Sequence, residues 1–129
     1  MKLFLIALIP YFLIAATQSC EICHMSMTPK APTSYMATQK GKAVPLCSYS
    51  CAHRFHKKYP HEPLKCFGYG AGKELDTAQA YFAFKSPTLD RAYNDTMLPV
   101  VVAFESECMA KKVAPDGKIV QGFEKIEAQ

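Results

Sequence analysis

The sequence lacks the long apolar run that a membrane-spanning helix requires, and its longest basic cluster is only Arg54 with Lys57 and Lys58, in a predicted helix. Such a helix needs about 20 consecutive apolar residues, and the longest apolar stretch here, residues 3–16, is shorter. The net charge of +4 is small beside the clustered Lys and Arg residues of nucleic-acid-binding proteins. We therefore expect no transmembrane helix and no nucleic-acid ligand.

Catalytic signatures are also missing from the sequence. It contains no Ser-His-Asp arrangement, no paired-carboxylate signature and no glycine-rich loop of the kind that holds phosphate groups. These absences exclude the usual sequence indications of hydrolysis and phosphoryl transfer. We expect that the protein is not an enzyme.

The start of the chain has the pattern of an export signal. Lys2 supplies a positive charge and residues 3–16 form an uncharged apolar stretch. This pattern predicts a signal peptide over residues 1–19 and a periplasmic protein. Small residues at Ala15 and Ala16 suit ordinary cleavage, whereas Cys20 is the attachment point if the segment is a lipoprotein signal that anchors the protein to a membrane.

The remaining residues, about 110, suit one small domain or two modules that share a core. The pattern predicts an N-terminal module at 20–72 and a C-terminal module at 73–129, each in the order strand, strand, helix, strand. In the first module we expect strands at 34–38, 43–47 and 64–69 and a helix at 49–59. In the second we expect strands at 80–84, 100–104 and 118–123 and a helix at 106–113. The predicted class is α+β, with small antiparallel or mixed sheets each covered by a helix.

Cysteine and methionine are concentrated directly after the export signal. Cys20 and Cys23 lie beside His24, Met25 and Met27. A disulfide scaffold does not require this density of soft donor atoms, whereas Cu(I) is selected by thiolate and thioether ligands. The segment therefore predicts a copper(I) site.

The expected geometry of this site follows from strand periodicity. Side chains alternate along an extended segment, so Cys23, Met25 and Met27 would point to one side and His24 to the other. Three sulfur atoms on one face would form an open Cu(I) site centred on Cys23.

The motifs in this order resemble those of the NosL family, the copper-binding accessory proteins of nitrous oxide reductase. In the first half they are the segment Cys20-Glu21-Ile22-Cys23-His24-Met25, Pro29, a hairpin at Gly41, and Leu46-Cys47-Ser48 at the start of a helix. In the second half they are Leu75-Asp76, Ala80-Tyr81-Phe82, Met97 ahead of the strand at 100–104, and Gly117-Lys118-Ile119 leading to Phe123.

The resemblance implies a periplasmic, often lipid-anchored metallochaperone that carries Cu(I) to the assembly machinery of nitrous oxide reductase. It also implies two related modules and places the copper ligands on Cys23, Met25 and Met97. His24 departs from the family pattern, in which glycine is usual, and adds a candidate nitrogen ligand. Cys20 is a further candidate. Cys66 and Gly68 also depart from the family pattern, since relatives often have His and Asp at these positions.

Two other readings use the same cysteines. Cys20, Cys23 and His24 complete a haem c attachment motif, which would make the protein an electron carrier with Met97 as a second axial ligand. Pro29 and the surrounding strands argue against this reading, because small cytochromes c are mostly helical. A thiol-disulfide exchange site would place the Cys-x-x-Cys pair at the start of a helix after a strand, and here the pair begins the exported chain.

The other four cysteines have less distinct patterns. Cys47 and Cys51 are one turn apart at a predicted helix start, and we favour helix packing or a disulfide over a second soft-metal site. Cys108 is expected to be a spare thiol on the second helix, and Cys66 lies in a predicted strand. The sequence does not assign a disulfide pairing to these residues.

Overall fold

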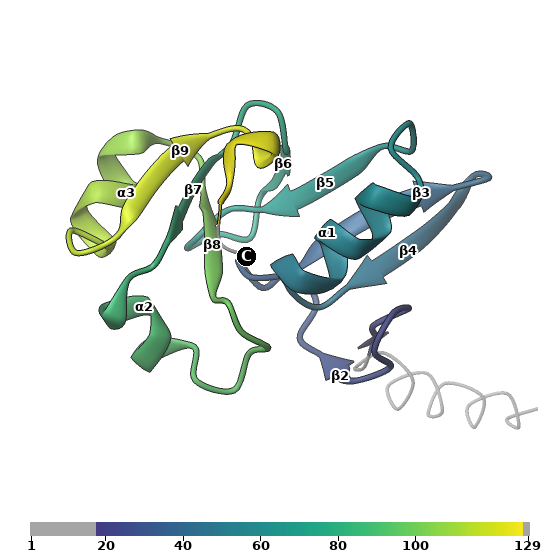
Figure 1. Cartoon of the computed structure of the whole chain (residues 1–129), viewed down its shortest axis with the longest axis horizontal. Coiled ribbons are helices and arrows are strands. Elements are labelled where there is room, and N and C mark those ends of the chain that lie inside the picture. The colour runs from purple at the N-terminus through teal and green to yellow at the C-terminus, as the bar shows by residue number, and fades with distance from the viewer. Residues whose placement is uncertain (1–17, 128–129) are drawn as a thin grey trace, which may run out of the picture.

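The structure is a computed structural model that describes residues 18–127. The predicted signal peptide lies outside the described residues, apart from Gln18 and Ser19 at its end. The described chain folds into small antiparallel sheets with short helices, so the predicted α+β class is confirmed (Figure 1). Among the helices within this range, none has both the length and the apolar character needed to cross a membrane.

The larger sheet has four strands in the order β4-β3-β5-β6. They are β3 (Tyr35–Gln39), β4 (Lys42–Leu46), β5 (Leu64–Phe67) and β6 (Glu74–Asp76). Lys40 and Gly41 connect β3 to β4 with φ angles of 51° and 78°. Two consecutive left-handed residues form the tight hairpin turn that matches the twist of antiparallel strands, which is why glycine suits position 41.

Helix α1 (Tyr49–Lys58) follows β4 and lies across the β3–β4 hairpin (Figure 1). The Ser48 side chain caps it by accepting a hydrogen bond from the backbone N–H of Cys51. Its buried face includes Tyr49, Ala52 and Phe55, which have helical spacing. The cap fixes where the helix begins and therefore where the cysteines on either side of Ser48 lie.

The smaller sheet has three strands in the order β8-β7-β9. Its strands are β7 (Tyr81–Phe84), β8 (Val101–Phe104) and β9 (Lys118–Gln121). The same part of the chain forms the helices α2 (Pro87–Ala92) and α3 (Glu107–Val113) and the 3-10 turn η2 (Phe123–Lys125). Both faces of β8 are buried. Val101 and Ala103 belong to the core shared with the larger sheet, whereas Val102 and Phe104 pack into a second cluster that includes Leu89 of α2 and Ala110 of α3.

Aromatic contacts join the two sheets. Phe82 of β7 stacks on Tyr35 of β3 with ring centroids 6.4 Å apart, and Phe123 meets Tyr35 edge-on at 5.5 Å. Such pairs add to the stabilisation from apolar burial alone. The two halves of the chain therefore share one principal hydrophobic core.

Three features were not expected from the sequence. A short hairpin of β1 (Gln18–Ser19) and β2 (Ser26–Met27) precedes the larger sheet, β6 adds its fourth strand, and α2 lies between β7 and β8 in the chain. The start of α2 carries a recognisable signal, because Ser86 caps the helix and Pro87 occupies its first turn. The helix has only six residues, so its apolar periodicity is too short to detect.

Candidate metal centre

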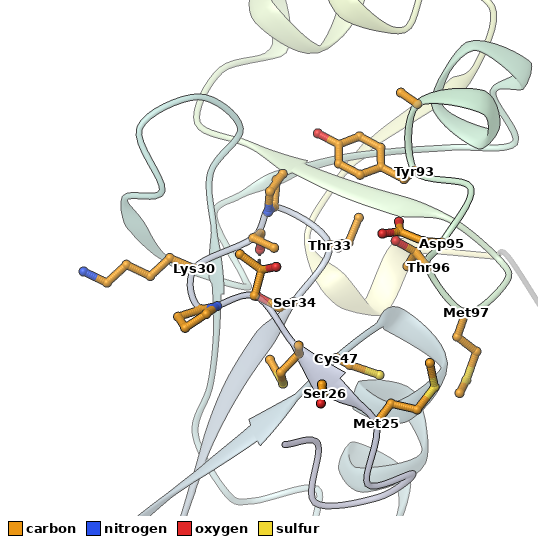
Figure 2. A pocket seen from close by; sticks show the side chains of 16 residues that line it. Met25, Ser26, Lys30, Thr33, Ser34, Cys47, Tyr93, Asp95, Thr96 and Met97 are labelled. Carbon is orange, nitrogen blue, oxygen red and sulfur yellow. Dashed lines mark hydrogen bonds between the residues drawn. The ribbon is translucent and has the colours of Figure 1, made fainter. Parts of the chain in front are cut away.

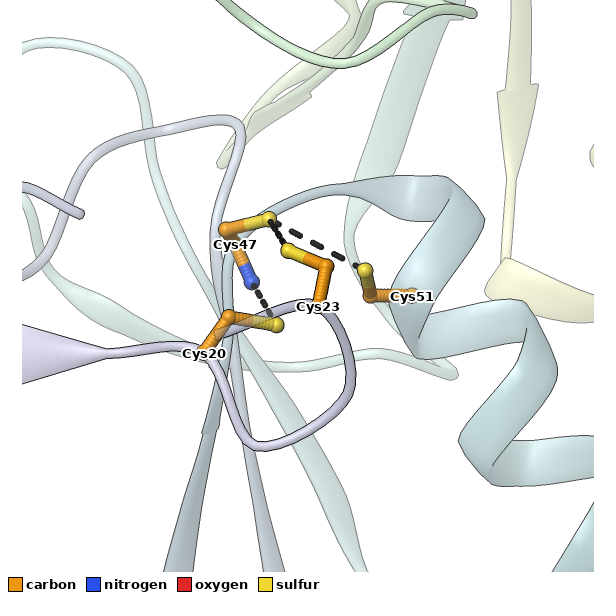
Figure 3. A group of neighbouring side chains, drawn as sticks. All are labelled: Cys20, Cys23, Cys47 and Cys51. Atoms are coloured by element: carbon orange, nitrogen blue, oxygen red, sulfur yellow. Dashed lines mark hydrogen bonds between the residues drawn. The ribbon is translucent and has the colours of Figure 1, made fainter. Parts of the chain in front are cut away.

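Four cysteine side chains converge where the β1–β2 hairpin meets the start of α1. The sulfur atoms of Cys20, Cys23, Cys47 and Cys51 all lie within 4.8 Å of one another (Figure 3). All four are free thiols. Within residues 18–127, this is the one group of three or more His, Cys, Asp or Glu side chains placed closely enough to hold a metal ion.

A turn between β1 and β2 presents Cys20 and Cys23. The backbone N–H of His24 donates to the carbonyl of Cys20 at 2.9 Å, and the N–H of Cys20 donates to the carbonyl of Met25 at 2.9 Å. His24 has a φ of 64°, and this left-handed residue turns the chain back on itself. The extended conformation predicted from Cys23 to Met27 is therefore wrong, since residues 21–23 form a turn and only Ser26 and Met27 are in a strand.

The start of α1 and the residue before its cap supply the other two thiols. Cys47 directly precedes the Ser48 cap and Cys51 lies in the first turn of the helix, and the two thiols lie near each other at the helix start (Figure 3). The Sγ of Cys47 is 3.4 Å from that of Cys23 and 3.9 Å from that of Cys51. A backbone hydrogen bond of 3.0 Å from Glu21 to Pro45 holds the hairpin against β4 beside this cluster.

Two of the sulfur separations are close to those of a tetrahedral metal site. Zn–S bonds of about 2.3 Å place the sulfurs of a tetrahedral site roughly 3.8 Å apart. The separations from Cys47 to Cys23 and from Cys47 to Cys51, 3.4 and 3.9 Å, bracket this value. Thiolates select soft and borderline ions such as Cu(I) and Zn(II). The site can therefore hold a thiophilic metal ion.

The hydrogen bonds around Cys20 favour its thiolate. Burial alone would raise the pKa of this thiol, but backbone N–H groups of Cys23, Cys47 and Ile22 point at its sulfur and lower the pKa to about 7. The contact from the N–H of Cys47 is 3.4 Å long. Burial raises the pKa of Cys51 to about 11 and also raises that of Cys47. In the metal-free cluster Cys20 is thus readily ionised, whereas Cys47 and Cys51 stay protonated at neutral pH.

The cluster is closed on one side and open on the other. Cys20 and Cys51 are 1% and 0% exposed, whereas Cys23 and Cys47 are half-buried. Cys47 lines a cavity of about 460 Å³ together with Met25 and Met97 (Figure 2). In Figure 2 the side chains of Met25 and Met97 extend toward one another at this cavity. Two of the thiols are thus buried, while the rest of the cluster borders solvent and two thioethers.

The candidate ligands predicted from the sequence lie in different places. Cys20 and Cys23 belong to the four-cysteine cluster. Met25 is 46% exposed and lies with the half-buried Met97 on the wall of the adjoining cavity, although the two come from opposite halves of the chain. His24 is exposed and is not a member of the cluster.

Sequence reasoning missed Cys47 and Cys51 as cluster members. The available signal was the presence of a Cys-x-x-Cys pair and a second close cysteine pair in the same chain, which is a pattern typical of zinc sites. Their placement at a helix start favoured packing when they were considered alone. The hairpin that brings the first pair to this helix start could not be read from periodicity.

The geometry also bears on the rival readings. Covalent haem attachment requires two reachable thiols, but Cys20 is buried and its sulfur accepts a hydrogen bond from Cys47. A thiol-disulfide exchange motif places its first cysteine at a helix start, whereas Cys20 and Cys23 lie in a turn between two short strands. Both readings are therefore less compatible with the structure than a metal centre.

No protein-family model, curated protein or solved structure matches this chain. The geometry of the four-cysteine cluster and the sequence motifs are therefore the basis for assigning a function.

Proposed function

We propose that the protein binds copper(I) at the four-cysteine cluster and passes it to another protein, and that binding and release are its whole activity. The observation that carries this proposal is the asymmetry of the cluster. Two thiols are buried, and the other two lie at an edge where Cys47 and the thioethers of Met25 and Met97 line one cavity. Thiolate and thioether donors together are the combination that selects Cu(I).

Ligand exchange at this edge gives a physical route for release. Cu(I) accepts low coordination numbers, so Cys20 and Cys51 are able to retain the ion while an incoming ligand replaces Cys23 or Cys47. Met25 and Met97 offer weaker sulfur donors at the cavity through which that ligand approaches. A centre that is rigid on its buried side and replaceable on its open side suits a carrier.

We further propose that the protein works in the periplasm and delivers its ion to the assembly machinery of nitrous oxide reductase. The apolar N-terminal segment and the resemblance to the NosL family support this part of the proposal. The four-thiolate site needs a free sulfur on Cys20, and a lipid on that atom would remove one ligand. The proposal therefore favours an ordinary signal peptide over a lipoprotein signal.

Competition with a colorimetric Cu(I) chelator tests the copper site. The reduced protein, kept without oxygen, is expected to withdraw a single Cu(I) ion per chain from the chelator. The double variant Cys20→Ser/Cys51→Ser removes both buried thiols and is expected to lose this competition. Cys108→Ser, which alters an exposed thiol on α3 outside the cluster, is the matched control. Failure of the unaltered protein to compete would contradict the copper proposal.

A permanently bound zinc ion is the second candidate. The gathering of four sulfurs within 4.8 Å of one another favours it, because closed four-cysteine sites are typical of structural zinc. Its function would be to hold the β1–β2 hairpin against α1. Titration of the zinc-loaded protein with Cu(I), followed by a zinc-sensitive dye, separates the candidates. Zinc release is expected for the copper carrier, and retention of zinc would favour the structural role.

A further inference from the structure

The thiols of Cys23 and Cys47 form a pair that the metal-binding proposal does not by itself explain. Their sulfurs are 3.4 Å apart although the residues are separated by 24 positions. Both side chains are half-buried, whereas Cys20 and Cys51 are almost fully covered. This close sulfur contact thus joins the two half-buried members of the cluster.

We propose that Cys23 and Cys47 form a disulfide in the metal-free protein, by exchange with an external disulfide, and that this bond prevents metal binding. Formation of a bond of about 2.05 Å from a separation of 3.4 Å requires only a small movement. The bond removes two of the four ligands, and a metal centre needs them as free thiolates. The proposal holds for either metal, since it concerns the empty cluster.

The chemistry balances without a further reagent. One of the two cysteines, as a thiolate, attacks the external disulfide to form a mixed disulfide and expels one thiolate. The other cysteine then attacks the protein sulfur of the mixed disulfide and expels the second thiolate. The two protons lost by the cysteines end on the two expelled thiolates, and the external disulfide receives two electrons. A dithiol reductant reverses both steps.

Accessibility and distance favour a disulfide between Cys23 and Cys47 over the other pairings of the four cysteines. An external disulfide must first meet an exposed sulfur, which excludes an initial attack by Cys20 or Cys51. Cys51 is also held in the first turn of α1, and its sulfur is 3.9 Å from that of Cys47. The Cys-x-x-Cys spacing alone would have suggested a bond between Cys20 and Cys23. The fold instead favours a bond between the hairpin and the residue that precedes α1.

A functional consequence follows if the protein is exported. Free thiol pairs are oxidised in the oxidising compartments to which exported proteins are sent. The metal-free protein would therefore remain unable to bind metal until a dithiol reductant acted on it. A bound metal ion would protect the same sulfurs. Metal occupancy and oxidation would therefore be mutually exclusive states of this cluster.

Peptide mapping tests the pairing directly. The reduced, metal-free protein is equilibrated with oxidised and reduced glutathione, its remaining thiols are alkylated, and it is digested with trypsin. Cleavage after Lys30, Lys42 and Arg54 separates Cys20 and Cys23 from the peptide that holds Cys47 and Cys51. We expect a covalent link between the two peptides, assigned to Cys23 and Cys47 by fragmentation. A bond within either peptide, or a link through a buried cysteine, would overturn the proposal.

Two double variants test the argument from accessibility. Cys20→Ser/Cys51→Ser keeps the half-exposed pair and is expected to form the link at a rate close to that of the unaltered protein. Cys23→Ser/Cys47→Ser keeps the buried pair and is expected to link at least about tenfold more slowly. Equal rates in the two variants would overturn the proposal. Circular dichroism checks their folding, and the mapping of the unaltered protein remains decisive if either variant does not fold.

Metal preloading gives a separate outcome for the proposed function. Zn(II) bound before the addition of glutathione is expected to prevent the link. Unchanged oxidation in the presence of Zn(II) would show that the four thiols do not hold the ion together. That result would contradict the proposal that the four thiols bind a metal and the proposal that the disulfide prevents metal binding. It would not affect the disulfide pairing found by peptide mapping.

Discussion

The sulfur of Cys20 accepts a hydrogen bond from the backbone N–H of Cys47 at 3.4 Å, which connects the β1–β2 turn to the start of α1. This contact places a donor on a buried sulfur and helps to lower the pKa of Cys20 to about 7, against the opposing effect of burial. The cluster therefore provides one thiolate near neutral pH before any metal arrives. Cys47 and Cys51, whose pKa values burial raises, ionise only when a cation compensates their charge.

We expect metal affinity to rise with pH. Cys51, with a pKa of about 11, and Cys47, with a raised pKa, are protonated at neutral pH, so binding must release their protons. Below about pH 7 Cys20 is protonated as well, and the dependence on pH should become steeper. Chelator competition from about pH 6 to pH 8 measures this slope. Affinity that does not change over this range would contradict thiolate coordination.

Replacement of a buried cluster cysteine should abolish tight binding. Loss of a group that hydrogen-bonds to a metal ligand typically reduces metal affinity by about 10–100-fold. Cys51→Ser removes a ligand itself, so we expect it to reduce metal affinity by more than about 100-fold. Cys66→Ser is the matched control, because Cys66 is equally buried but its thiol contacts the carbonyl of Leu75 on β6. Equal affinity in the two variants, measured by chelator competition, would exclude Cys51 as a ligand.

Local patterns were sufficient to predict the principal strands and two of the three α-helices. The hairpin at Lys40 and Gly41, the Ser48 cap and the β-branched strand at residues 100–104 each depend on neighbouring residues, so the sequence reveals them. Helix α2 and strand β6, by contrast, are too short for periodicity to show.

The candidate site was predicted only in part, because it is a tertiary arrangement. Cys20 and Cys23 stand out by spacing, but their partners depend on how the β1–β2 hairpin lies against α1. The left-handed residue His24 reverses the chain at the point where strand alternation had been assumed. Alternation would have placed Met25 beside Cys23 in the same site, whereas the turn puts Cys23 in the cluster and Met25 on the cavity wall.

His24→Gly should leave metal affinity unchanged and should not reduce stability. The imidazole is exposed and lies outside the four-cysteine group, so no ligand is lost. Glycine adopts the left-handed φ of 64° without the steric cost that a Cβ imposes. Thermal unfolding and chelator competition check both expectations. A marked loss of affinity would instead identify His24 as a ligand.

Met97→Leu should slow metal transfer more than it weakens binding. Leucine nearly preserves the side-chain volume but removes the thioether at the cavity. The four cysteines remain, so the equilibrium affinity for Cu(I) should change little, while the rate of exchange to a chelator should fall. Met109→Leu on α3 is the control, because it removes a thioether from an exposed side chain that does not line this cavity. Identical exchange rates in the two variants would exclude Met97 from the transfer route.

Asp116 should make the fold sensitive to acid. Its carboxylate accepts hydrogen bonds from the Ser86 hydroxyl and from the backbone N–H and hydroxyl of Thr88, so it fixes the start of α2 from the loop before β9. The bonds from Ser86 and Thr88 lower the pKa of Asp116 below its usual value of about 4. A lowered pKa in the folded state stabilises the protein at pH values above the unfolded-state pKa, and this stabilisation disappears as pH falls through the folded-state pKa.

Asp116→Asn should therefore reduce the free energy of unfolding at neutral pH and should show a weaker loss of stability on acidification. Denaturant unfolding at several pH values measures this difference, with Asp95→Asn in the exposed loop after α2 as the control. Parallel pH profiles for the unaltered protein and Asp116→Asn would contradict the assignment.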